Sequence, residues 1–208
     1  MRAPVLGLLL TLACLSCFAQ DQHANLVNRA VRHLSTGKFA DALAILDPLV
    51  KDDTTDITLR HNRAIAYFNL KKYREALDDY LFLIRENPLP EYLFQAGNSY
   101  EHLNKPDSAL AYYTRTLDVE KDNFLYFFKR GTALLKTSKF SAAILDFNEA
   151  LILNPEHSNS MHNRGLAKFA SGNDRGACED WCDASILGNA MASLHLSRNC
   201  KSFPSRCR

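Results

Sequence analysis

The chain has 208 residues, of which 47% are hydrophobic and 23% charged, and its formal net charge is +2. These proportions are close to those of folded soluble proteins and exclude a wholly disordered chain. The 25 Lys and Arg residues are scattered among 23 Asp and Glu residues without a long basic run. Because phosphate binding needs a concentrated basic surface, nucleic acid is excluded as the expected partner.

The first 19 residues have the order of a secretory signal. Arg2 supplies a positive charge, residues 5–15 are almost wholly apolar, and small residues stand where a signal peptidase reads, ending at Ala19. The apolar run is shorter than the roughly 20 residues that a membrane-spanning helix needs, and no other segment is long and apolar enough. We expect cleavage after Ala19, a periplasmic or secreted mature chain, and no membrane span.

Two alternatives remain open for this N-terminal segment. It could be a buried N-terminal helix, or a lipoprotein signal in which Cys14 or Cys17 is lipidated. Each of these cysteines follows a small residue, but Thr11 and Cys14 stand three positions upstream, where Leu is usual.

The rest of the chain repeats with a nearly constant period. One slot holds, in turn, Ala42, Ala76, Ala109, Ala143 and Ala177, at intervals of 34, 33, 34 and 34 residues. A fixed period of this size indicates stacked supersecondary units that bury their apolar faces only against one another.

On these residues the chain resembles the tetratricopeptide repeat, a helix-turn-helix unit of about 34 residues. A small residue recurs on each first helix, and a large residue recurs on each second helix. The small residues are Ala30, Ala64, Gly97, Gly131 and Gly165, and the large ones are Leu46, Tyr80, Tyr113, Phe147 and Trp181. The resemblance implies an all-α fold, a right-handed α-solenoid of five helix-turn-helix repeats plus a C-terminal capping helix.

The expected solenoid covers residues 20–200, and residues 201–208 form a tail. The expected repeats are residues 23–56, 57–89, 90–123, 124–157 and 158–189, followed by a cap helix at 190–200. Pro106 is expected to open a second helix, and Pro88 and Pro155 to end one. On the cap, we expect Ala190, Ala192 and Leu194 to point inward, with Ser193, His195 and Arg198 toward water.

The resemblance also implies a concave groove lined by the second, fifth, ninth, twelfth and thirteenth positions of each first helix. The groove residues taken from these positions are His61, Ile65, Phe68, Asn69, Phe94, Asn98, Glu101, His102, Phe128, Thr132, Lys136, His162 and Phe169. Aromatic anchors mixed with polar groups suit a bound peptide or partner helix. About half of the apolar members are expected to pack in the core instead.

The family's carboxylate-clamping groove has Lys where His61 and His162 stand here, so we do not expect that activity. The combination of a signal, five repeats and this C-terminal end resembles small exported tetratricopeptide proteins of Gram-negative bacteria, in particular the Bacteroidetes type.

Four cysteines follow the signal segment, and an even count in an exported chain favours disulfides. Three pairings are possible. We predict Cys178–Cys200, which fastens the cap, and Cys182–Cys207, which fastens the tail. A zinc site is the alternative, although the spacing of the second cysteine pair fits poorly.

No phosphate loop, nucleophile elbow or metalloprotease motif is present in the sequence. The adjacent acids at 78–79 and 179–180 do not share a helix face, so they are interpreted as solvated charges. We therefore expect a non-catalytic scaffold that binds a protein or peptide partner, with no cofactor and no metal. The alternative function is an envelope protein associated with peptidoglycan or glycan, or an outer-membrane lipoprotein.

Overall fold

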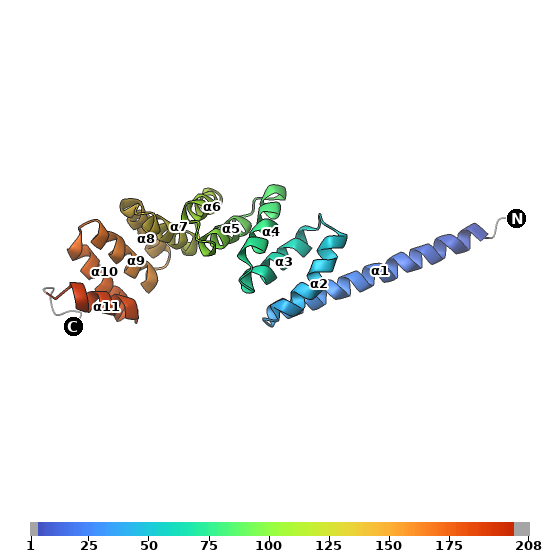
Figure 1. The fold of residues 1–208 in the computed structure, drawn as a ribbon, viewed down its shortest axis with the longest axis horizontal. Helices are drawn as coiled ribbons and strands as arrows, with labels where there is room; N and C mark the ends of the chain where they lie inside the picture. Colours follow the sequence, from blue (N-terminus) through green and yellow to red (C-terminus); the bar gives the residue numbers. More distant parts are fainter. Residues whose placement is uncertain (1–3, 202–208) are drawn as a thin grey trace. The chain divides into compact units, whose positions relative to one another are not determined.

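The computed structural model describes the backbone of residues 4–201 and the side chains of residues 20–201. This part of the chain consists of eleven α-helices and contains no strand, so the predicted all-α repeat fold is confirmed. The described residues form two compact units, one that ends at Glu86 and one that begins at Asn87 (Figure 1). Among the described residues, no helix combines the length and the apolar character that crossing a bilayer requires.

The first unit contains two helix pairs. Its helices are α1 (Pro4–Ser35), α2 (Phe39–Asp52), α3 (Ile57–Asn69) and α4 (Tyr73–Glu86). Each helix packs on the next, and α1 also contacts α3. The core between α1, α2 and α3 includes Ala30, Leu46 and Leu59, all essentially inaccessible to solvent. The signal-like residues 4–19 belong to the first half of α1, and their side chains lie outside the described ones.

The second unit contains three helix pairs and a single final helix. Its helices are α5 (Pro90–His102), α6 (Pro106–Val119), α7 (Phe124–Lys136), α8 (Phe140–Leu153), α9 (Ser158–Ala170), α10 (Asp174–Ile186) and α11 (Ala190–Asn199). Consecutive helices pack against one another throughout, so each pair rests on the next. As predicted, Pro106 opens α6, while α4 and α8 end shortly before Pro88 and Pro155.

A glycine on each first helix of the second unit lies against the largest side chain of the partner helix. A Cβ added at this glycine would come within 2.5 to 2.8 Å of the aromatic ring, well inside contact distance. The pairs are Gly97–Tyr113, Gly131–Phe147 and Gly165–Trp181. The sequence position that requires a small residue is therefore the point where the two helices approach most closely.

Buried Arg–Asp ion pairs also join the two helices of a repeat. They recur at equivalent positions 16 residues apart, as Arg63–Asp79, Arg130–Asp146 and Arg164–Asp180. Each is bidentate, with both guanidinium–carboxylate distances between 2.6 and 2.9 Å. The interpretation of Asp79 and Asp180 as solvated charges is wrong, because only 2% and 3% of these residues is exposed. An arginine of the preceding helix supplies the compensating charge that allows their burial.

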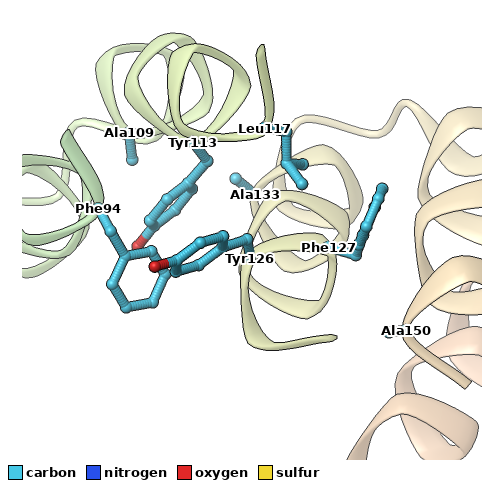
Figure 2. Close-up of a cluster of buried hydrophobic side chains, with 8 residues drawn as sticks. All are labelled: Phe94, Ala109, Tyr113, Leu117, Tyr126, Phe127, Ala133 and Ala150. Carbon is cyan, nitrogen blue, oxygen red and sulfur yellow. The ribbon is translucent and has the colours of Figure 1, made fainter. Parts of the chain in front are cut away.

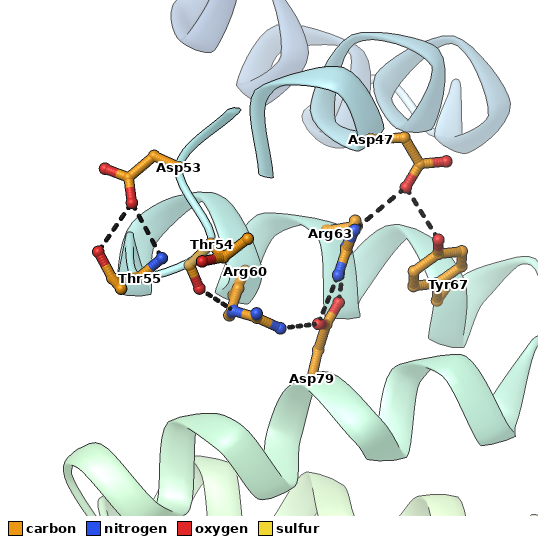
Figure 3. A network of polar contacts seen from close by, with 8 residues as sticks. All are labelled: Asp47, Asp53, Thr54, Thr55, Arg60, Arg63, Tyr67 and Asp79. Atoms are coloured by element: carbon orange, nitrogen blue, oxygen red, sulfur yellow. Dashed lines mark hydrogen bonds and ion pairs between the residues drawn. The ribbon is translucent and has the colours of Figure 1, made fainter. Parts of the chain in front are cut away.

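In the first unit this ion pair is the centre of a larger network (Figure 3). Asp79 also accepts a hydrogen bond from Arg60 at 3.0 Å, and Arg63 reaches Asp47 of α2 at 3.5 Å. The Tyr67 hydroxyl donates to the same Asp47 carboxylate at 2.8 Å. Burial, reinforced by this bond to a carboxylate, raises the pKa of Tyr67 to about 12. The network therefore joins α3 both to α2 of the preceding repeat and to α4 of its own repeat.

The cap helix α11 has a different register from the predicted one. Ala192 is fully buried, Leu196 packs against the same cluster, and His195 stacks on Trp181 at 5.0 Å between ring centroids. Ala190 and Leu194 are exposed, so the prediction that both point inward is wrong. The physical reason is the spacing of the inward face: Ala192, Leu196 and the buried Cys200 follow one another at intervals of four residues, which places them on one side of a helix.

Every turn between the two helices of a repeat contains one residue in the left-handed region. These residues are Gly37, Lys71, Asn104, Ser138 and Gly172. Left-handed backbone costs a residue with a Cβ about 1 kcal/mol, whereas glycine adopts it without this penalty. Ser138 has a φ of 59° and Gly172 a φ of 84°, so chemically different residues meet the same conformational demand.

We expect Ser138→Gly to raise the free energy of unfolding by about 1 kcal/mol, because it removes the left-handed penalty. The reciprocal change Gly172→Ser should lower it by a similar amount, and open space around Gly172 excludes a steric cause. Urea unfolding followed by circular dichroism measures both. A neutral or destabilising Ser138→Gly would contradict the turn analysis.

Candidate functional site

The first helices of the second unit carry most of the predicted groove residues, and we call their groove positions the first-helix face. Within the described residues, these positions range from buried to exposed. Phe94 and Asn98 are buried; Glu101, Phe128, Thr132 and His162 are partly buried; His102, Lys136 and Phe169 are exposed.

Phe94 and Asn98 belong to the packing below this face. The Phe94 ring lies 5.7 Å from that of Tyr113 and 4.8 Å from that of Tyr126, between centroids (Figure 2). Asn98 accepts a hydrogen bond from the Tyr113 hydroxyl at 2.8 Å and donates one to Gln95. Both side chains are committed to internal contacts, so they support the face without offering it much surface.

Glu101 is the electrostatic centre of the face. Its carboxylate accepts hydrogen bonds from Lys136 at 2.7 Å, Lys129 at 3.0 Å and the Tyr113 hydroxyl at 3.1 Å. Burial alone would raise the pKa of Glu101, but the two ammonium groups outweigh it and lower the pKa to about 2. Burial and the Glu101 charge raise the pKa of Tyr113. One carboxylate thus holds two cations, which leaves the cluster one positive charge in excess.

A cavity of about 200 Å³ opens beside this cluster. It is lined by Glu101, Asn104, Pro106, Ala109, Ala133 and Lys136. Its volume is below the 300 to 1,000 Å³ or so typical of sites for small-molecule ligands. It is large enough for a single side chain of a bound peptide.

Aromatic and amide contacts join α7 to α9 on the same face. Phe128 meets His157, the residue before α9, in an edge contact at 4.8 Å between ring centroids, and lies 6.2 Å from Phe147. The Asn163 amide donates a hydrogen bond to the Thr132 hydroxyl at 3.3 Å. These contacts fix two neighbouring first helices relative to each other, which gives the face a preformed spacing.

The C-terminal end of the face is built around Trp181. Phe169 lies 5.5 Å from its ring, and its indole N–H donates to the His162 carbonyl at 3.2 Å. The His162 ring lies 5.3 Å from that of His195 on α11. Burial, with a contribution from the neighbouring His195 charge, lowers the pKa of His162.

The other predicted groove residues lie on α3 of the first unit and form a separate set. Phe68 packs edge-on against Tyr73 at 5.3 Å. The Asn69 amide donates to the Ile65 carbonyl at 2.9 Å, one helical turn back. His61 and Ile65 are partly buried on the same helix. These four residues thus belong to the first unit.

Three of the four cysteines that are predicted to form disulfides lie within the described residues. Cys178 on α10 and Cys200 after α11 are joined as a disulfide, with their Cα atoms 5.8 Å apart. Cys182 is a disulfide cysteine as well, while its predicted partner Cys207 lies outside the described residues. The first bond ties the cap helix to the last repeat.

Sequence reasoning missed Lys129. It lies at the sixth position of a first helix, which the groove pattern leaves out, yet it contacts the neighbouring first helix. A usable signal was present in the spacing, since Lys129 follows Glu101 by 28 residues and Lys136 follows it by 35, close to one repeat.

Glu101→Gln should lower the free energy of unfolding at pH 7 by about 1 to 2 kcal/mol, after allowance for solvent screening. The folded-state pKa of Glu101 lies below its ordinary value of 4.5, so its ionised form stabilises the fold above that pH. The difference between the two proteins should then disappear as the pH falls from about 4.5 to about 2. Unfolding measured over this range tests it, with the exposed Glu149→Gln as control; a constant difference would contradict it.

The family model of the tetratricopeptide repeat matches residues 61–124 and 128–193. These two segments cover more than half of the chain. Relatives include the human RNA polymerase II-associated protein 3, 30% identical over 130 residues, and the Drosophila melanogaster Hsc70-interacting protein 1, 36% identical over 86 residues. The matches cover 62% and 41% of this chain, but only 18% and 22% of those two proteins.

Solved structures share the fold at low sequence identity. YrrB, described as a tetratricopeptide-repeat protein with an unusual peptide-binding site, superposes with a TM-score of 0.77 at 20% identity, covering 88% of this chain and 96% of YrrB. MamA from Desulfovibrio magneticus superposes with a TM-score of 0.76 at 18% identity, covering 82% of this chain and 97% of MamA. With its repeat period, its paired helices and these matches, the chain belongs to the tetratricopeptide-repeat family.

Proposed function

We propose that this chain is a non-catalytic scaffold of the cell envelope that binds a peptide segment or helix of another protein on the first-helix face of residues 87–201. The observation that carries this proposal is the face itself. It combines partly exposed aromatic side chains with a preformed polar cluster around Glu101, and a side-chain-sized cavity opens beside that cluster. Aromatic anchors and fixed polar groups are what peptide-binding surfaces use for burial and for register.

The relatives support a role in protein binding. The name of the Hsc70-interacting protein refers to a protein partner, and the description of YrrB refers to a peptide-binding site. These proteins and this chain have the repeat in common. The proposal therefore takes from them protein binding in general and not their particular partners.

The envelope context is supported by the signal-like order of residues 1–19 and by the cysteines near the C-terminus. Disulfides persist in oxidising compartments, and export would place the Cys178–Cys200 bond in one.

Site-specific photo-crosslinking tests the binding role. A photoreactive amino acid in place of Phe128, in cells that produce the full chain, should capture a defined protein partner. The same residue in place of Leu145, which is 65% exposed on the second helix α8, is the matched control and should capture none. Equal capture at both positions, or capture of glycan at position 128, would overturn the proposal.

Intact mass of the purified protein tests the envelope context. Loss of residues 1–19 and a non-reduced mass about 4 Da below the fully reduced one, from two disulfides, are expected. A retained signal segment with all six cysteines as free thiols would indicate a reducing compartment. An acylated Cys14 or Cys17 would indicate a lipid anchor in place of cleavage after Ala19.

A further inference from the structure

The cap helix α11 continues the first-helix face instead of ending it. The helices α7, α9 and α11 are preceded by Asn123, His157 and Asn189 at equivalent N-cap positions. Counting from these caps, Met191 and Leu194 stand at the second and fifth positions of α11, the positions that Leu125 and Phe128 occupy on α7. These are groove positions, and on α11 they are occupied by apolar residues.

Met191 and Leu194 are exposed to 54% and 38%, so an apolar surface is available at the end of the chain's last helix. Phe169 of α9 is exposed to 42% on the same face. The cap is held firmly against α9 and α10: Asn189 donates to Asn159 at 3.0 Å, His195 stacks on Trp181, and Cys200 is joined to Cys178. Met191 and Leu194 are thus presented on a fixed helix and not on a fraying end.

The charges of these three helices have one sign. Together α7, α9 and α11 contain six basic residues and no Asp or Glu. The basic residues are Lys129, Arg130, Lys136, Arg164, Lys168 and Arg198.

Three carboxylates from other helices pair with five of these cations. Glu101 holds Lys129 and Lys136, Asp146 holds Arg130, and Asp180 holds Arg164 and Lys168. Six cations against three carboxylates leave a formal excess of three positive charges. Lys136, with about half of its side chain exposed, and the exposed Arg198 are the accessible members.

Exposed apolar side chains on helices with an excess of positive charge complement an acidic segment that also carries apolar side chains. A basic partner, or a second copy presenting the same face, would meet like charge.

We propose that the partner segment is an acidic amphipathic peptide, and that the cap helix binds it through Met191, Leu194 and Arg198. This inference rests on the proposed peptide-binding function and adds the chemistry of the partner and the part played by α11. The aliphatic side chains of the segment contact Met191 and Leu194, and its carboxylates lie near Arg198 and the Lys136 cluster.

Selection of a random 16-residue peptide library, displayed on phage, against the full chain tests this inference. The selected peptides should be enriched in Asp, Glu and large apolar residues, and higher salt should weaken their binding several-fold. The double variant Met191→Ser/Leu194→Ser should weaken binding about tenfold. The charge reversal Arg198→Glu should also weaken the binding of acidic peptides.

The matched control is Leu145→Ser/Ile152→Ser, which changes two aliphatic side chains of α8 that are 65% and 70% exposed. It should leave binding unchanged, and an unaltered melting temperature of both double variants excludes unfolding as the cause.

Three outcomes separate the inference from the proposed function. The inference would be overturned if the selected peptides were rich in Lys and Arg, or if acidic peptides bound the cap variants as tightly as the unchanged protein. If peptides of either kind lose binding on Phe128→Ala, the proposed function is supported and only the role of α11 is wrong. If the library yields no binding peptide at all, both are overturned.

Discussion

The close approach of two helices within each repeat is the constraint on which the rest of the structure depends. In the second unit, a glycine on the first helix accepts the ring of Tyr113, Phe147 or Trp181, with no space for a Cβ. The aromatic side chain then fills the volume between the helices, where it contributes more buried area than any aliphatic residue could. The next repeat packs on the surface of this helix pair. A larger side chain in place of one glycine would therefore also disturb the packing of the adjacent repeats.

The buried Arg–Asp pairs add direction to this packing. Hydrophobic burial is non-directional, whereas a bidentate guanidinium–carboxylate contact is satisfied in one relative orientation of the two helices. The third repeat has Ala96 and Tyr112 at the two positions and so has no such ion pair; the Tyr112 ring lies 5.2 Å from that of Tyr100 instead. The helices of a repeat can therefore pair without the ion pair, which serves orientation more than net stability.

The same pairing governs the charge of the candidate binding surface. The carboxylates that compensate the basic first helices come from α5, α8 and α10, and they are largely buried. The cations extend further toward solvent, as the exposures of Lys136 and Lys129 show in comparison with that of Glu101. Long cationic side chains can reach solvent from a partly buried stem, whereas Asp cannot. The positive excess of α7, α9 and α11 therefore lies toward solvent, while the carboxylates that offset part of it lie deeper.

Much of the fold could be predicted from the sequence alone. The period of the alanines determined the number of repeats, the small and large residues determined which helices pair, and the prolines determined where α4, α6 and α8 begin or end. These features are local or strictly periodic, so they can be recognised without knowledge of the third dimension. The prediction of Cys178–Cys200 followed from the place of Cys178 on the second helix of the last repeat, next to the expected cap helix.

The remaining features were decided by tertiary structure. The repeat position of Phe94 predicts a groove residue, but Phe94 is a packing residue because its ring lies against those of Tyr113 and Tyr126. The sequence predicts that Asp79 and Asp180 are solvated. Both are buried because each is paired with the arginine that lies 16 residues earlier in the chain. The sequence pattern predicts that Leu194 points inward, but Leu194 is exposed because α11 turns Ala192, Leu196 and Cys200 toward the core. Each of these outcomes depends on contacts between helices, whereas the sequence pattern records only which residues share a helix.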